Sequence, residues 1–154
     1  AALVAVGHSL PLLSGVLAGV SVNAFVIDAI IGLSVVYKAL DNLRAFERWF
    51  GRAPNARVAT LLFGLFHGLG LATKIQDFQV SPEGLLPNLV AFNVGVELGQ
   101  VLALSMILIA MSYWRRLPSF GRRAWGANVA IMAAGFVLMG YQMVGYFITR
   151  SFTA

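Results

Sequence analysis

Three side chains suited to binding cations lie within apolar stretches of this sequence. Glu97 is the only acidic or basic residue between Leu85 and Tyr113, and His67 lies in the apolar segment GLFHGLGLA. His8 lies in a third such segment, near the start of the chain. Imidazole suits nickel, cobalt, zinc or copper, and a carboxylate compensates the metal charge. The three residues therefore predict a site for a divalent metal ion.

The same residue types allow two other interpretations. A histidine and a glutamate can simply hydrogen-bond and hold two helices together. They can also relay protons without any metal. The residue types alone leave all three interpretations open, although His8 adds some weight to the metal site.

The composition indicates which elements must position these residues. The chain has 154 residues, of which 59% are hydrophobic and only 11% charged, as is typical of an integral membrane protein. A helix that crosses the hydrocarbon core needs about 20 mostly apolar residues. We therefore predict an all-α, polytopic membrane helix bundle of about five transmembrane helices in one domain, residues 1–154. The predicted helices cover residues 1–20, 24–43, 58–73, 85–113 and 125–148.

Charge placement predicts the orientation of this bundle. Arginines gather in the loops 44–57 and 115–123, and an excess of basic residues marks cytoplasmic loops. Trp49, Trp114 and Trp125 fall near the same boundary, as an aromatic belt would. We therefore expect a multi-pass protein of the bacterial inner membrane, with both arginine-rich loops in the cytoplasm. The net charge of +5 is explained by these loops, so nucleic acid is not an expected partner. The chain starts at Ala1 without methionine, and we expect an N-terminal portion to be missing.

Depth and helical spacing predict that the three cation ligands meet. His8, His67 and Glu97 each fall close to the middle of a predicted span. Asn93, Glu97 and Gln100 follow the spacing i, i+4, i+7 and form one polar stripe. The glycine pairs Gly64/Gly68 and Gly95/Gly99 have the spacing that lets helices approach closely. We expect these glycines to bring His67 and Glu97 together.

The remaining polar residues receive supporting roles. Asn93 and Gln100 are expected to donate hydrogen bonds around the site rather than bind the metal. Asp28 marks either an outer entrance or only the membrane interface. Asp41 and Asn42 are either structural partners of Lys38, with Lys38 and Asp41 forming a pair, or an inner exit. Lys74 is expected to extend to the interface and pair with Asp77, and Ser9 to bond its own helix backbone.

Enzymatic function is not predicted. The chain has no cysteine, phosphate-binding loop, H-E-x-x-H motif or nucleophile elbow. We therefore expect neither catalysis nor a permanently bound cofactor. A bound metal ion (nickel, cobalt or zinc) would be cargo.

Four segments together resemble a known family. GHSLPLL at 7–13, DNL at 41–43, LFHGLGLA at 65–72 and FNVGVELGQ at 92–100 are similar in order and spacing to the HupE/UreJ family of bacterial membrane proteins. The resemblance covers about residues 5–105. The resemblance implies that the protein is a secondary permease that supplies nickel or cobalt. By position in the matching segments, it implies that the functional polar residues are His8, Asp41, Asn42, His67, Asn93, Glu97 and Gln100. This sequence differs from the family pattern at Pro11, where threonine is usual, and at Asp41, where glutamate is usual. It also lacks the N-terminal Asp-His motif that family members usually have.

The sequence thus favours a permease for a divalent transition metal such as nickel or cobalt. Its metal ligands would be His67, Glu97 and His8, and its partners the lipid bilayer and the metal ion. A different reading is an accessory subunit of a larger membrane complex, packed against other membrane subunits or a second copy. A third interpretation is a metal sensor or metal chaperone that binds the ion without transporting it.

Overall fold

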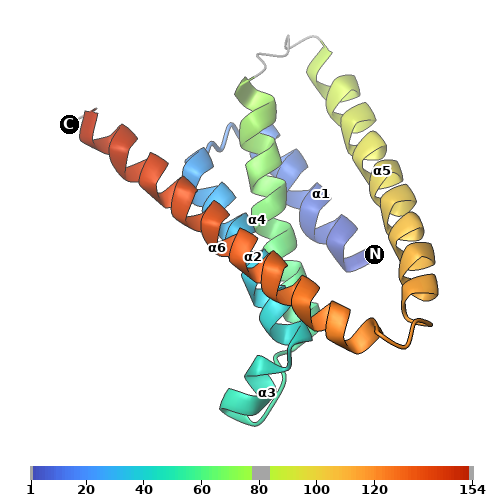
Figure 1. The fold of residues 1–154 in the computed structure, drawn as a ribbon. Coiled ribbons are helices and arrows are strands. Elements are labelled where there is room, and N and C mark those ends of the chain that lie inside the picture. Colours follow the sequence, from blue (N-terminus) through green and yellow to red (C-terminus); the bar gives the residue numbers. More distant parts are fainter. Residues whose placement is uncertain (1, 78–83, 153–154) are drawn as a thin grey trace.

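The structure, a computed structural model, describes residues 2–77 and 84–152, with side chains described for residues 7–76 and 84–152. Its elements are α1 (Ala2–Leu17), α2 (Ala24–Asn42), α3 (Ala45–Phe50), α4 (Ala56–Asp77), α5 (Leu85–Trp114) and α6 (Phe120–Phe152). All regular elements in this described part are helices, which confirms the predicted all-α class. Each predicted helix overlaps one of the long helices (Figure 1). The short α3, inside the arginine-rich loop 44–57, was not predicted.

Local chemistry explains where the first two helices end and begin. Gly19 has φ +64° and follows the last turn of α1, where Val20 N–H bonds the Gly15 carbonyl and Gly19 N–H bonds the Val16 carbonyl. This is a Schellman cap, whose left-handed residue is most easily glycine. Asn23 then caps α2, because its side-chain oxygen accepts from Val26 N–H at 3.3 Å.

Glycines bring α1 and α4 into close contact. Gly7 packs on Gly64, and a Cβ added at Gly68 would overlap the backbone carbonyl of His8. Further along the same interface, a Cβ added at Gly15 would lie 2.9 Å from Ala72 Cβ. The prediction that Gly64 and Gly68 permit close approach is confirmed, and the partner helix is α1. A cluster of Leu12, Val16, Ala72 and Leu89 fills the end of this contact.

A second close contact joins α2 to α6, which lies along it (Figure 1). Gly32 and Gly135 face each other, so that a Cβ on Gly32 would lie 2.9 Å from the Gly135 carbonyl oxygen. Asn42 donates to the Asn128 side chain at 2.9 Å. One face of α6 therefore supports α2.

Helix α5 stands apart from the others on the far side of α1 (Figure 1). Most of its apolar side chains are exposed, including Leu98 and Leu108. The expected contact at Gly95 and Gly99 is wrong, because no heavy atom of the described residues beyond the helix itself lies within 4 Å of a Cβ built at either glycine. Within the described residues, α4, α5 and α6 are long and apolar enough to cross a membrane. The exposed apolar surface of α5 is therefore suited to lipid.

Candidate metal-binding groove

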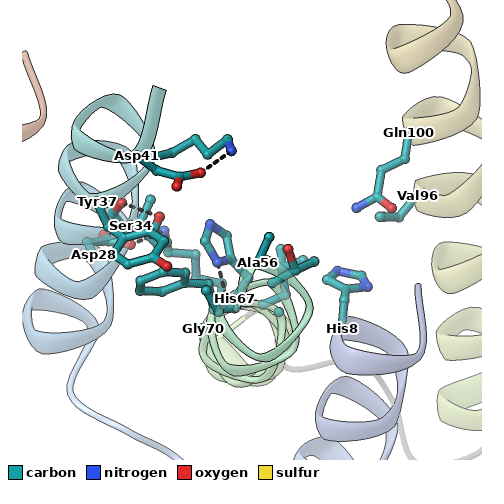
Figure 2. Close-up of a pocket in the computed structure, with 18 residues that line it drawn as sticks. His8, Asp28, Ser34, Tyr37, Asp41, Ala56, His67, Gly70, Val96 and Gln100 are labelled. Atoms are coloured by element: carbon teal, nitrogen blue, oxygen red, sulfur yellow. Dashed lines mark hydrogen bonds and ion pairs between the residues drawn. The ribbon is translucent and has the colours of Figure 1, made fainter. Parts of the chain in front are cut away.

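A cavity of about 490 Å³ lies between α1, α2, α4 and α5 (Figure 2). Its polar lining comes from every one of these helices: His8 from α1, Asp28, Ser34, Tyr37, Lys38 and Asp41 from α2, Thr60, His67 and Lys74 from α4, and Gln100 from α5. Five predicted site residues, namely His8, Asp28, Asp41, His67 and Gln100, therefore line one space. Glu97, Asn93 and Asn42 do not line it.

The cavity is a groove that follows the helices rather than a pit in the surface. On α4 its lining repeats every three or four residues, from Ala56 through Thr60, Phe63 and His67 to Lys74. Residues at this spacing form one face of a helix. At a rise of about 1.5 Å per residue, the face is roughly 27 Å long. That length is close to the hydrocarbon thickness of about 30 Å.

His67 is held in one orientation within this groove. Its Nδ1 lies 2.7 Å from the carbonyl oxygen of Phe63, one turn earlier in α4. A carbonyl oxygen can only accept, so Nδ1 must carry the proton and donate. In the neutral ring Nε2 is then left with a free lone pair, which is the form that binds metals. Figure 2 shows the ring standing off α4 into the space between α2 and α1.

His8 lies across the groove from α2 and is buried, with 3% of its surface exposed. Neither of its ring nitrogens has a hydrogen-bond partner among the described residues. A buried polar group without a partner costs about 1–3 kcal/mol, so such groups call for an explanation. A ligand that reaches His8 from the groove would supply one.

Glu97 is bound to α1 and not to α4. Ser9 Oγ donates to Glu97 Oε1 at 2.8 Å, a contact that the sequence analysis missed by assigning Ser9 to its own backbone. Asn93, one turn before Glu97 on α5, has a buried side-chain oxygen with no partner in the described structure. The polar stripe of α5 thus faces α1 near His8, while Gln100 reaches the groove itself (Figure 2).

The three predicted metal ligands do not form a preassembled cluster. Over residues 2–77 and 84–152, no group of three or more His, Asp or Glu side chains is close enough to hold one metal ion. His8 and His67 share the groove, and Glu97 lies at the α1–α5 contact, where it bonds Ser9. The structure therefore holds these three side chains at separate positions.

Ion pairs lie at both ends of the groove. Lys74 Nζ contacts Asp28 at 3.1 Å between α4 and α2, and Lys38 Nζ contacts Asp41 at 2.7 Å within α2. The second pair was predicted from its i, i+3 spacing and is confirmed. For Lys74 the structure gives Asp28 as partner, while the side chain of the expected partner, Asp77, lies outside the described residues.

Sequence reasoning also missed several lining residues. Ser34, Tyr37 and Thr60 carry hydroxyl groups on the groove, and none had been selected. Thr60 lies two helical turns before His67, so counting in helical steps would have reached it. Ser34 is reached from Asp28 only by two steps of three residues, through Ile31. Asn42 follows a different face of α2, because its side chain bonds α6.

Replacing Ser9 by alanine is expected to weaken the attachment of α5. The variant loses the hydroxyl that bonds Glu97, and interhelical hydrogen bonds in membranes average about 0.6 kcal/mol, reaching about 1.7. A loss of about 1 kcal/mol is expected in unfolding titrations in mixed detergent micelles. Ser14→Ala is the matched control, because Ser14 Oγ bonds only the Leu10 carbonyl of its own helix. Equal losses in both variants would contradict the interhelical role of Ser9.

Comparison with known proteins identifies the family of the chain. A family model described as HupE / UreJ protein matches residues 1–150, nearly the whole chain. No curated protein and no solved structure matches the chain significantly. The matched family consists of membrane proteins generally associated with nickel and cobalt transport, not of enzymes. This chain belongs to the HupE/UreJ family.

Proposed function

We propose that the protein is a secondary permease for a divalent transition-metal ion such as nickel or cobalt. The observation that carries this proposal is the groove, which follows α4 from Ala56 to Lys74 and has the oriented imidazole of His67 along its course. A site that only stored a metal would need a closed set of ligands. A path needs ligands spread along its length, each weak enough to release the ion.

His67 is the central ligand in this mechanism. Its Nε2 lone pair replaces one water of the incoming ion, while the Phe63 carbonyl holds the ring in place. His8 can then bind the ion from α1 through a nitrogen that has no other partner among the described residues. Gln100 offers an amide oxygen on the same wall.

Glu97 supplies charge compensation when α5 moves. Helix α5 makes few contacts with the rest of the described bundle, and these include the Ser9–Glu97 hydrogen bond. A shift of α5 that breaks this bond would free the carboxylate for the ion held between His8 and His67. Metal ligation requires deprotonated groups, so proton exchange at Glu97 or the histidines would couple to transport.

The proposed setting is the bacterial inner membrane. Figure 1 shows α3 and the α5–α6 connection at the same end of the bundle, and both belong to arginine-rich segments. The positive-inside rule would place this end in the cytoplasm. Asp28 and Lys74 would then lie at the outer mouth, and Lys38 and Asp41 at the inner mouth.

The direct test is metal flux in proteoliposomes that contain only the purified chain. Uptake of radioactive nickel or cobalt should be saturable and should exceed that of empty liposomes, because the groove provides a ligand-lined path. Copurifying proteins are quantified in the same preparation. A folded chain that carries neither metal, and that retains a stoichiometric partner from the membrane, would overturn the proposal in favour of an accessory subunit.

The groove should also be wet, unlike the lipid-facing surface of α5. The chain has no cysteine, so a single thiol can be introduced without background. Ser34→Cys on the groove is expected to react with a water-soluble maleimide and to be protected by nickel. Ser105→Cys is the matched control, because Ser105 is exposed on α5 and bonds only its own helix. Equal labelling of both positions, or of neither, would contradict an aqueous groove.

A further inference from the structure

We propose that Asp28 is a cation-capture site at one mouth of the groove and that Lys74 is its removable counter-ion. This inference rests on the proposed transport function. It adds to that function a binding site, Asp28, and a latch, by which we mean the Lys74–Asp28 ion pair that the arriving cation opens. Both residues line the groove, and Lys74 Nζ lies 3.1 and 3.4 Å from the two carboxylate oxygens of Asp28. The pair joins α4 to α2 across the groove.

A lysine in a cation path needs an explanation. Its ammonium group repels a divalent ion unless a carboxylate neutralises it. The Asp28 side chain is 22% exposed and that of Lys74 is 50% exposed, so the pair is weak and in contact with the surroundings of the mouth. An arriving divalent cation attracts Asp28 and repels Lys74. The ion can therefore take the place of the ammonium group on the same carboxylate.

The backbone around this pair is fastened, so opening requires only the lysine side chain to move. Ile27 packs against Gly70, where an added Cβ would lie 2.5 Å from Ile27 Cγ2. Val22 N–H bonds Thr73 Oγ1 at 3.2 Å, and Gln76 Nε2 bonds the Val20 carbonyl at 3.0 Å. These contacts tie α4 to the α1–α2 linker and to α2. The four-carbon stem of Lys74 is free to rotate away from Asp28.

The opposite mouth lacks this arrangement among the described residues. Lys38 and Asp41 also form an ion pair, but both belong to α2 and are three residues apart. Their bond does not cross from one wall of the groove to another. The ion pair at the Asp28 mouth therefore links two helices. The ion pair at the other mouth only neutralises the charge of Lys38.

The test compares Asp28→Asn with Lys74→Gln in nickel uptake by cells that express the full chain. Lys74→Gln should lower the half-saturation concentration about two- to five-fold, because the competitor of the metal is lost and such exposed pairs are weak. Asp28→Asn should raise it at least about five-fold, since the carboxylate is lost and the ammonium is left unneutralised. Glu47→Gln is the control for a lost carboxylate, because Glu47 pairs with Arg44 outside the groove.

A purely structural ion pair predicts a different result. Both variants would then shift uptake in the same direction, or neither would shift it, and either result overturns the latch. Thiol labelling gives a readout that does not depend on flux: in the Ser34→Cys background, Lys74→Gln should raise the labelling rate about two- to five-fold. If the unmodified chain carries no nickel, the proposed transport function is wrong. If Lys74→Gln leaves the labelling rate of Ser34→Cys unchanged, the latch is wrong, whatever the result for transport.

Discussion

Replacing His67 by alanine is expected to abolish measurable metal transport. Removing even an outer partner of a metal ligand costs about 10- to 100-fold in affinity, so removing the ligand itself should cost at least about 100-fold. The variant should still fold, because the lost Nδ1 bond runs to a carbonyl of the same helix and holds no second helix in place. Nickel binding by isothermal titration calorimetry should fall together with uptake.

Phe66→Ala is the matched control for this experiment. Phe66 precedes His67 on α4, is 37% exposed and does not line the groove. Its truncation removes an aromatic side chain from the same helix without touching the path, so binding and uptake should be retained. If His67→Ala and Phe66→Ala retain the same uptake, His67 is not a ligand on the transport path and the proposed mechanism is wrong.

The second large effect is expected from Gly68→Ala. The new Cβ would overlap the carbonyl of His8, and backbone cannot move aside unless α1 separates from α4. Overpacking of this kind typically costs about 1–3 kcal/mol. Because the clash also displaces His8 from the groove, uptake should fall along with stability. Unfolding titrations in mixed micelles and nickel uptake measure the two effects.

Gly95→Ala isolates the packing effect. The substitution is chemically the same and also lies within a long helix, so the gain in helix propensity of about 0.5–1 kcal/mol is shared. Gly95 has open space where the Cβ would go. The Gly95→Ala substitution should therefore leave the stability unchanged or raise it slightly. A Gly68→Ala variant that behaves like Gly95→Ala would show that α1 and α4 do not cross as described.

The two glycine pairs show the limit of a sequence pattern. Gly64/Gly68 and Gly95/Gly99 have identical spacing, and both lie beside a residue suited to binding metal. In the structure the first pair packs on α1 and the second faces open space. The spacing only says that a helix can be approached closely. Which helix approaches depends on how all the apolar faces of the bundle are buried together.

Contacts within one helix were predictable, and contacts between helices were not. The Lys38–Asp41 pair follows from a separation of one helical turn. The Lys74–Asp28 pair and the Ser9–Glu97 hydrogen bond join residues 46 and 88 positions apart. Depth estimates brought His8, His67 and Glu97 to similar levels, but depth does not determine the rotation of each helix about its axis.

The sequence by itself determined that the chain is helical, where its long helices run and which side chains are costly to place among apolar residues. These are local properties, because they follow from hydropathy, length and helical spacing. Only the tertiary structure decided that His8 and His67 share a groove, that Glu97 is held by Ser9, and that Lys74 meets Asp28. The reason is that the rotation of each helix about its axis, and the helices that it packs against, depend on how the apolar surfaces of all helices are buried together. No single segment of the sequence contains that information.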